Sequence, residues 1–376
     1  MDREKTKEKR PPFWRREPVL CAAAACALAS MGLEPPSAAY LAYIDWRVIA
    51  LLFCLMAVVA GLQSCGVFAM LAQRLLAGER NLRFVTLVLV LLPFFVSMLV
   101  TNDVALITFV PFAALVLGLI GRTERLLYVV VLQTIAANLG SMATPVGNPQ
   151  NLYLYASFSL TAGQFFSTVL PLSLVSLAGL CIAALRVRPE DIRVSFAQPA
   201  ALRQPGKLAL MAGLFALCLL SVFRVLPWPA LLGVVLAAMA LFDRTLFRRV
   251  DYGLLATFFC FFLFAGNLGA CPPVRDALTA LMARHAALTA GLASQVISNV
   301  PAAVLLSAFT EDWRGLLIGA NVGGLGTPIA SLASLISLKL YFKSEGARPG
   351  RYLLVFSATN AVGLAVLSLA ARIVFH

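Results

Sequence analysis

The chain has 376 residues, of which 61% are hydrophobic and only 12% are charged, and its mean hydropathy is +0.89. A soluble domain of this size cannot bury so much apolar side chain, because its surface needs far more charged residues. The composition therefore excludes a soluble protein. Several stretches approach or exceed the roughly 18 apolar residues that cross a bilayer, which predicts an all-α polytopic membrane protein.

The net charge of +13 orients the chain in its membrane. We assign 24 of the 30 Lys and Arg residues to segments on the cytoplasmic side, as the positive-inside rule requires. These segments are 1–17, 74–83, 122–125, 186–207, 243–251 and 339–351. The remaining basic residues are Arg47, Arg224, Arg275, Arg284, Arg314 and Arg372. We expect a plasma or inner membrane protein with a cytoplasmic N-terminus, the lipid bilayer as its surroundings, and no nucleic-acid partner.

The first predicted repeat covers residues 18–185 and follows a basic cytoplasmic tail, 1–17. It begins with two spans, 18–33 and 47–63, and an amphipathic interfacial helix, 66–76. Residues 84–121 are then apolar except for Thr101-Asn102-Asp103, and arginines flank both ends. Because both ends favour the cytoplasm, we predict a re-entrant hairpin with these three residues at its tip. Two ordinary spans joined by a tight outer turn are the alternative.

A broken helix, 126–155, is predicted next because it contains NLGSMATPVGNPQN, Asn138 to Asn151, inside an apolar run. Glycine and proline stop a membrane helix from being continuous. A span at 165–185 completes the repeat. The polar segment 186–207 is predicted to be a cytoplasmic linker, and 208–225 a connecting helix.

The second predicted repeat, 226–376, has the same order of elements. It contains spans at 230–242 and 252–268, an interfacial helix at 271–285, and a hairpin at 287–312 with Ser298-Asn299-Val300 at its tip. A second broken helix, 315–338, and a last span, 352–373, follow. The whole chain therefore contains about nine transmembrane helices and two re-entrant hairpins.

Sequence similarity between the halves supports the repeat. NVGGLGTP, residues 321–328, follows NLGSMATP by 183 positions, so Asn138, Gly140, Thr144 and Pro145 match Asn321, Gly323, Thr327 and Pro328. DWRVIALLFC, from residue 45, also matches DYGLLATFFC, from residue 251. The connecting helix has no counterpart and would invert the second half. Broken apolar segments at corresponding places indicate a transporter's binding site. Gly and Pro breaks that serve only helix packing are the alternative, and they would explain one motif but not its duplicate.

The hairpin tips and breaks supply the candidate site residues. Freed carbonyls and side-chain oxygens at a helix break can replace a cation's water shell, and half-helix N-termini favour anions. The predicted cation-binding residues are Thr101, Asn102, Asp103, Asn138, Gly140, Ser298, Asn299, Asn321 and Gly323. The predicted substrate-binding residues are Thr144, Pro145, Gly147, Asn148, Asn151, Thr327 and Pro328.

Asp103 is the one acidic residue in the first hairpin, and Val300 replaces it in the second. A lone carboxylate at membrane depth costs about 2.5–3.5 kcal/mol on insertion scales, so a function or a partner normally explains it. Asp103 could ligate sodium or carry a coupling proton. It could instead cap the second arm of the hairpin, because Asx residues favour helix N-termini.

Other function classes fit the sequence less well. No HExxH or GxSxG motif is present, and the cysteines and two histidines form no zinc pattern, so we expect neither an enzyme nor a cofactor nor a metal site beyond sodium. A passive channel would need a polar lining along several spans. Here the polar groups are concentrated at two breaks.

The motifs TNDVALITFVP, NLGSMATPVGNPQNLYLY, SNVPAAVLLSAF and NVGGLGTPIASLASLISLKLY resemble the ion transporter superfamily. That superfamily includes citrate transporters, divalent anion/sodium symporters, arsenite permeases and some sodium/proton antiporters. The resemblance implies a homodimer, elevator-type motion and cation sites at the hairpin tips. It predicts a secondary transporter of a small anion, such as citrate or another di- or tricarboxylate, coupled to sodium or protons. An arsenite-like oxyanion permease or a sodium/proton antiporter is the alternative.

Overall fold

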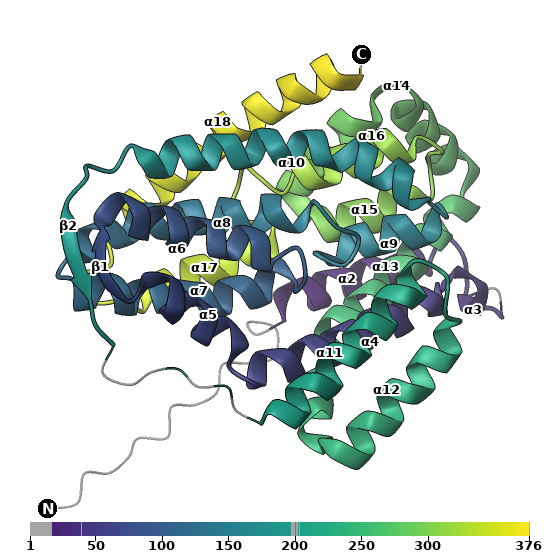
Figure 1. Cartoon of the computed structure of the whole chain (residues 1–376). Helices are drawn as coiled ribbons and strands as arrows, with labels where there is room; N and C mark the ends of the chain where they lie inside the picture. The colour runs from purple at the N-terminus through teal and green to yellow at the C-terminus, as the bar shows by residue number, and fades with distance from the viewer. Residues whose placement is uncertain (1–16, 39, 197–199, 201, 203, 376) are drawn as a thin grey trace, which may run out of the picture.

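The computed structural model describes residues 17–38, 40–196, 200, 202 and 204–375, so all but the last residue of the predicted tail lies outside the described residues. The described chain is helical apart from one two-stranded ribbon (Figure 1). Within it, six helices are long and apolar enough to cross a membrane. They are α4 (Trp46–Ser64), α7 (Asn102–Leu119), α10 (Ala162–Leu185), α11 (Pro205–Val222), α13 (Tyr252–Ala270) and α18 (Pro349–Phe375). The predicted all-α membrane fold is confirmed.

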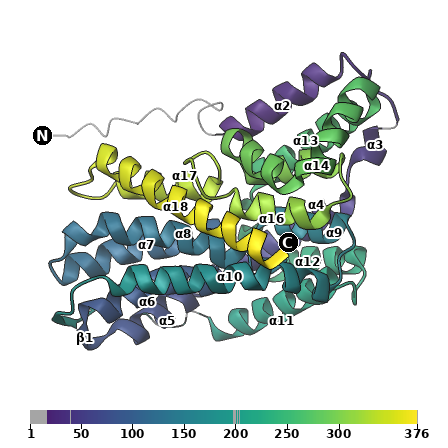
Figure 2. The ribbon, with the colours of Figure 1, turned by 90° about the horizontal axis from the view of Figure 1, so that it is seen from above.

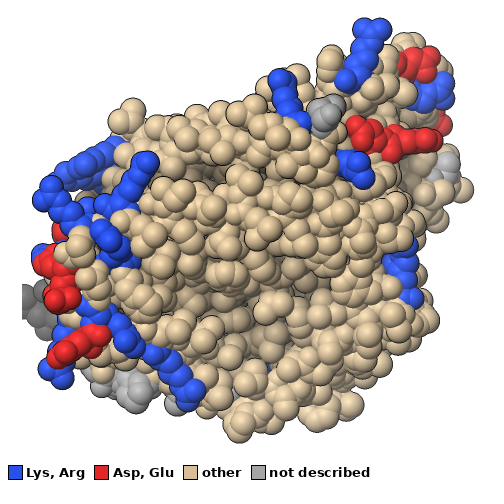
Figure 3. Space-filling view, turned by 45° about the horizontal axis from the view of Figure 1, so that its top comes forward, with Lys and Arg blue, Asp and Glu red and all other residues tan. Residues whose placement is uncertain are grey.

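Shorter apolar helices complete the membrane part. These are α2 (Pro18–Ser30), α5 (Val67–Leu76), α6 (Leu82–Val96), α12 (Trp228–Phe242) and α17 (Leu332–Phe342). On the face drawn in Figure 3, the charged side chains lie at two opposite ends, and the broad surface between the ends is uncharged. An uncharged band between two charged rims suits the hydrocarbon core of a bilayer, about 30 Å thick. The chain is an integral membrane protein.

In the first half, α6 and α7 are the arms of the predicted hairpin, and α8 (Leu126–Ser141) and α9 (Pro149–Ser157) are the parts of the predicted broken helix. The hairpin tip is buried, since Asn102 is only 6% exposed. Its backbone N–H donates to the Gly147 carbonyl, 3.3 Å away, in the break between α8 and α9. A turn between two complete crossings would instead lie at an outer surface, so the structure favours the re-entrant hairpin.

In the second half, α14 (Pro272–Ile297) has a kink at His285, where φ is −145° and ψ is 45°. The kink lies between the predicted interfacial helix and the predicted second hairpin. The hairpin continues with α15 (Asn299–Ser307), and α16 (Trp313–Val322) and α17 form the second broken helix. The order of elements therefore repeats that of the first half.

The similarity between the motifs at residues 45 and 251 has a structural basis. The Asp45 carboxylate accepts a hydrogen bond from the Val48 backbone N–H at 3.1 Å and caps α4. Asp251 accepts from the Leu254 N–H at 2.9 Å and caps α13 in the same way. Each aspartate satisfies one of the free N–H groups at a helix start.

A short ribbon was not predicted. β1 (Gly78–Asn81) pairs antiparallel with β2 (Asp191–Val194), which lies inside the predicted linker 186–207. An ion pair between Arg122 and Glu190 lies next to it. β1 has no apolar residue, and the alternation in β2 covers only four residues, so neither strand stands out in the sequence. The ribbon joins the start of the first hairpin to the segment after α10.

The helices form two groups (Figures 1 and 2). In the first group, α4 packs against α11 and α12, and α13 packs against α2; we call these five the framework helices. The second group, which we call the hairpin bundle, consists of α6 to α10 and α14 to α18. The two groups meet where α4 contacts α9 and where α13 contacts α14 and α15.

Candidate functional site

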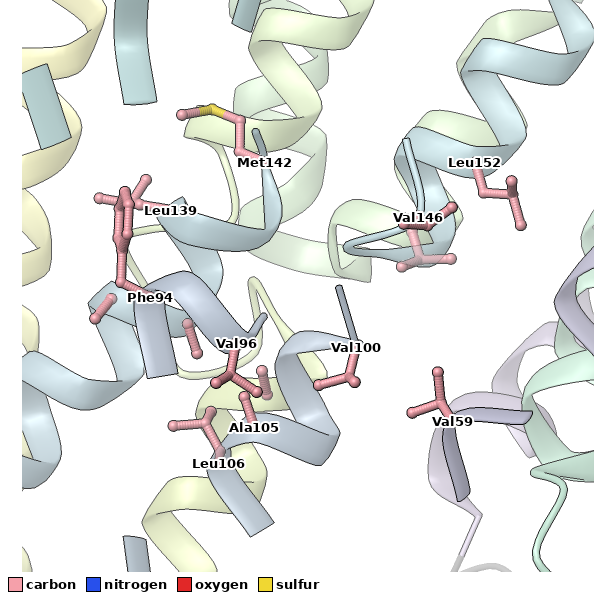
Figure 4. Close-up of a cluster of buried hydrophobic side chains, with 14 of the residues drawn as sticks. Val59, Phe94, Val96, Val100, Ala105, Leu106, Leu139, Met142, Val146 and Leu152 are labelled. Carbon is pink, nitrogen blue, oxygen red and sulfur yellow. The ribbon is translucent and has the colours of Figure 1, made fainter. Parts of the chain in front are cut away.

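Two breaks separate the half-helices: residues 142–147, before Asn148 at the N-cap of α9, and residues 323–330, before Ser331 at the N-cap of α17. The first break lies inside the protein, and the second is exposed at Thr327 and Ile329. Apolar side chains surround the first break, among them Phe94, Val100 and Leu139 (Figure 4). Backbone N–H and C=O groups in apolar surroundings need partners inside the protein. The hydrogen bonds of the two breaks therefore describe the site.

Asn138 lies in the last turn of α8, before the first break. Its Oδ1 accepts a hydrogen bond from the Ser331 hydroxyl at 3.0 Å, and its Nδ2 donates to Ser334 Oγ at 3.3 Å. Both serines follow the second break, at the start of α17. The asparagine before one break is thus bound to the residues after the other.

Asn321 makes the reverse connection from the last turn of α16. Its Nδ2 donates to Asn151 Oδ1 at 2.7 Å, and its Oδ1 accepts from Asn148 Nδ2 at 3.3 Å. Asn148 and Asn151 follow the first break. We call the two connections together the reciprocal asparagine contact. It brings together four predicted site residues and two serine partners from opposite halves, all six of them buried.

The hairpin tips bind the breaks in a corresponding way. The Asn102 backbone N–H donates to the Gly147 carbonyl, and the Asn299 N–H donates to the Ala330 carbonyl at 2.9 Å. Positions 147 and 330 are also 183 residues apart. In addition, Asn102 Nδ2 donates to Asn138 Oδ1 at 3.0 Å. The first hairpin tip is therefore bonded directly to Asn138, one of the two asparagines of the reciprocal asparagine contact.

The two predicted substrate-binding threonines face the hairpin arms. Thr144 donates its hydroxyl to the Met98 carbonyl at 2.5 Å, and Thr327 donates to the Gln295 carbonyl at 3.0 Å. Met98 and Gln295 each lie three residues before a hairpin tip, at Thr101 and Ser298. Thr327 is also exposed. These hydroxyls therefore fix each break against its own hairpin.

The carbonyls of the first break are bound by one side-chain amide. Asn151 Nδ2 donates to the Met142 and Thr144 carbonyls, at 3.1 Å each. Carbonyls that face an amide NH₂ are satisfied by protein and do not need water. We call this arrangement the first amide staple.

The second break has an amide staple from a different position. Gln295 Nε2 donates to the Gly323 and Leu325 carbonyls at 2.8 and 2.9 Å, and its Oε1 accepts from the Thr327 N–H at 2.9 Å. By the 183-residue offset, Ser334 corresponds to Asn151, and by the hairpin alignment Met98 corresponds to Gln295. Each half thus has one side-chain amide at these two positions. In the first half it is Asn151, after the break, and in the second half it is Gln295, before the hairpin tip.

The predicted glycines allow close backbone approach. A Cβ on Gly140 would overlap the backbone of Phe94 in α6, with its Cα only 2.8 Å away, and a Cβ on Gly323 would lie 2.8 Å from Gly291 Cα in α14. A Cβ on Gly147 would overlap the Ser141 backbone, within the first break. Pro145 is buried in the first break and Pro328 is half-buried in the second. The geometry therefore gives the glycines a packing role.

We expect Gly140→Ala to destabilise the protein by roughly 1–3 kcal/mol, because α8 can then no longer lie against the Phe94 backbone. The measurement is the thermal unfolding midpoint of purified protein in detergent. Gly118→Ala in α7 is the matched control, since nothing lies within 4 Å of the added Cβ. Equal midpoints for the two variants would contradict the packing role.

Asp103 is the one charged group among the predicted site residues. Within the described residues its carboxylate makes no hydrogen bond and no ion pair. Its backbone N–H donates to Asn102 Oδ1 at 3.1 Å, and Thr101, the N-cap of α7, makes no side-chain cap bond. The carboxylate therefore makes no cap bond to α7 in this conformation.

The second tip has a different backbone conformation. Ser298 has a φ of +73°, in a region that L residues other than glycine rarely adopt. Its hydroxyl lies 3.4 Å from the Ala330 carbonyl, to which it donates. Strained residues of this kind cluster at ligand sites and switch regions. The second tip thus has strain and no carboxylate, while the first has a carboxylate and no such strain.

Sequence reasoning missed Ser331, Ser334 and Gln295. The signals were present: Ser331, Ser334 and Ser337 recur every three residues in an apolar segment, which places them on one helix face. Ser337 accepts from Thr134 at 2.7 Å and extends the contact between α8 and α17. Gln295 is a lone amide just before a hairpin tip.

Comparison with known proteins agrees with this architecture. Residues 8–312 match the family described as citrate transporter. The chain belongs to the citrate transporter family. The protein is therefore a membrane transporter. Its similarity to other transporters indicates the same.

Three relatives illustrate the family. An uncharacterized transporter of Methanocaldococcus jannaschii is 28% identical over 331 residues, which cover 88% of this chain and 90% of the relative. The inner membrane protein YbiR of Escherichia coli is 30% identical over 306 residues, 80% of this chain and 81% of the relative. A silicon efflux transporter of rice, Oryza sativa, is 37% identical over 152 residues, 38% of this chain and 29% of the relative.

Proposed function

We propose that the protein is a secondary active transporter of a small anion, a di- or tricarboxylate such as citrate, coupled to sodium or protons. The observation that supports this most is the reciprocal asparagine contact, because it joins two broken helices from opposite halves. Breaks of this kind form the substrate and ion sites of secondary transporters. The predicted cation-binding and substrate-binding residues keep those roles in the proposal.

The charge of the substrate follows from the helix termini around the breaks. α7 begins at Asn102 and α15 at Asn299, the two hairpin tips, and α9 and α17 begin directly after the breaks. Each N-terminus carries partial positive charge, about half an elementary charge. Four such ends can stabilise carboxylate groups without a buried arginine. Asp103 supplies the negative charge that a coupling cation needs.

A second candidate is an oxyacid or oxyanion exporter, of the arsenite permease type. Two observations favour it: the rice relative is named as a silicon efflux transporter, and every predicted site residue except Asp103 is uncharged. An uncharged site suits a neutral oxyacid, which needs hydrogen bonds but no counter-charge. A sodium/proton antiporter would need Asp103 but no anion.

Uptake into proteoliposomes distinguishes these candidates. The purified protein is tested with labelled citrate, succinate and arsenite, each with an imposed sodium gradient, proton gradient or neither. Gradient-driven accumulation of a carboxylate supports the first candidate, and arsenite movement alone supports the second. If the labelled substrate only equilibrates across the membrane and no imposed ion gradient changes its uptake, the protein is a passive channel and the proposal is overturned.

For the motion, we propose an elevator mechanism in a homodimer. The framework helices would stay fixed while the hairpin bundle carries the two breaks across the membrane. The contacts between the groups, α4 with α9 and α13 with α14 and α15, would form the sliding interface. Crosslinking of cysteine pairs across these contacts should stop transport if the bundle moves, and a crosslinked protein with full activity would contradict the elevator.

Asp103→Asn is expected to remove the dependence of uptake on the coupling ion, because the variant keeps the shape of the side chain and loses its charge. Uptake should fall by about tenfold or more, which corresponds to about 1.4 kcal/mol. The measurement is uptake as a function of pH and of sodium concentration. Asp276→Asn, an exposed aspartate that pairs with Arg275, is the control. Unchanged pH and sodium profiles for Asp103→Asn would exclude the coupling role.

A further inference from the structure

A cavity of about 470 Å³ lies between α14, α16 and α18, and its lining includes Gln295 and Gly323 at the second break. Arg284, Arg314 and Arg372 line it, one from each helix. His285 and Asp312 lie among them. Asp312 is partly engaged, because its Oδ1 accepts from the Gly315 N–H and caps α16. Positive charge therefore dominates this part of the lining.

These arginines are three of the six basic residues that the cytoplasmic segments do not include. The orientation of the chain by the positive-inside rule therefore does not explain why these three arginines are present. None of the three forms an ion pair within the described residues; Arg314 lies over the rings of Trp313 and Phe375, with centroid distances of 5.3 and 5.8 Å. Three unpaired arginines from three helices make a site suited to a phosphate or carboxylate group.

The charges lie at one end of the cavity and the rest of its wall is apolar. From the arginines inward, the lining continues on α14 with Leu288 and Leu292, on α16 with Ile318 and Val322, and on α18 with Leu364. Arg314 and Val322 are eight residues apart on α16, which corresponds to a length of about 12 Å at 1.5 Å per residue. One leaflet of hydrocarbon is about 15 Å thick, half of the bilayer's core.

The apolar wall opens toward the hydrocarbon. Leu288 and Leu292 are 55% and 61% exposed on the surface of the protein. Below the arginines the polar side chains of the lining are Gln295, whose amide is already bonded to the second break, and Ser368, so a free anion would find few groups along this wall. An anion that carries an acyl chain satisfies both parts of the cavity, with its charge on the arginines and its chain along the leucines.

We propose that this cavity binds an anionic phospholipid, with the phosphate between Arg284, Arg314 and Arg372 and one acyl chain between α14, α16 and α18. Because α14 and α16 belong to the second hairpin and the second broken helix, the lipid would pack directly against the transport machinery. The site does not depend on which substrate is transported.

The test is native mass spectrometry of purified protein in detergent with added phosphatidylglycerol or phosphatidylcholine of equal chain length. We expect the wild type to bind the anionic lipid about tenfold more tightly than the zwitterionic one. Arg284→Gln/Arg314→Gln/Arg372→Gln should lose this preference. Arg275→Gln, an exposed change on α14 outside the cavity lining, should keep it.

Two further arms separate the possible sources of the anion. Inorganic phosphate and a short-chain phosphatidylglycerol should compete weakly, since the first has no acyl chain and the chains of the second are too short to fill the apolar wall. Equal competition by inorganic phosphate would assign the site to a free anion and overturn the lipid proposal, as would an unchanged lipid preference in the triple variant. If the triple variant does not fold, Arg372→Gln alone, near the end of the last helix, provides the same comparison with a smaller loss.

Discussion

Gln295→Met is expected to reduce transport by about tenfold or more, and the double variant Gln295→Met/Ser334→Asn to recover a large part of it. Methionine is the residue at the corresponding position 98 of the first half, and asparagine is the residue at the corresponding position 151. The double variant therefore gives the second break the amide staple of the first.

The expected loss follows from the bonds that Gln295 makes. Without its amide, the Gly323 and Leu325 carbonyls and the Thr327 N–H lose their side-chain partner. Each unsatisfied buried polar group costs about 1–3 kcal/mol. A loss of about 1.4 kcal/mol from the transport-competent conformation is already tenfold.

The expected recovery follows from the symmetry of the two halves. Asn151 donates to two break carbonyls and accepts from Asn321 at the same time. An asparagine at 334 would make the same two kinds of hydrogen bond: it would donate to the break carbonyls and accept from Asn138 in place of Asn321. Asn138 already donates to Ser334, so the direction of that bond need not change.

Initial uptake rates, divided by the amount of folded protein, measure both effects. Gln63→Met is the matched control, because the Gln63 amide donates only to the Thr108 hydroxyl, outside both breaks. It should stay within about twofold of wild type, since one solvent-accessible hydrogen bond contributes about 1 kcal/mol or less. A double variant no better than Gln295→Met alone would show that the staples are not interchangeable.

Much of the fold could be predicted from sequence, for physical reasons. The apolar runs, their flanking arginines and the Gly/Pro interruptions determine where helices start, stop and break. Asp45 and Asp251 were recognised as a matching pair, and both are helix caps. The offset of 183 residues identified Asn138 and Asn321 as equivalent positions, and both lie in the last turn before a break.

The partners of these residues could not be predicted in the same way. A repeat relates positions within each half but does not say which half each side chain contacts. Asn138 bonds to Ser331 rather than to a residue of its own break, and this pairing depends on how α8 and α17 pack. Gln295 was missed because its counterpart, Met98, is apolar, so the similarity between the halves hides its role. The β1–β2 ribbon was missed because pairing between distant polar segments leaves no local pattern.

The largest effect is expected for the reciprocal asparagine contact itself. Asn321→Ala should abolish most transport, because it leaves Asn151 Oδ1 without its donor and removes the acceptor that Asn148 Nδ2 reaches in the opposite half, so that Asn148 keeps Ser141 Oγ as its acceptor. Asn138→Ala should do the same by releasing Asn102 and Ser331. With one or two groups unsatisfied at about 1–3 kcal/mol each, a loss of roughly a hundredfold in uptake rate is expected for each variant.

Asn267→Ala separates this effect from a general loss of stability. Asn267 is a buried asparagine of α13 whose amide donates to the Ser30 and Tyr40 hydroxyls, at 3.0 and 3.1 Å, away from both breaks. It should lower the thermal unfolding midpoint about as much as Asn321→Ala does and leave uptake per folded molecule nearly unchanged. Three variants with equal stability and equal residual transport would mean that the contact between the halves only holds the fold together. Selective loss of uptake in Asn138→Ala and Asn321→Ala would instead show that the two breaks work as one site, because each asparagine reaches across to the other half.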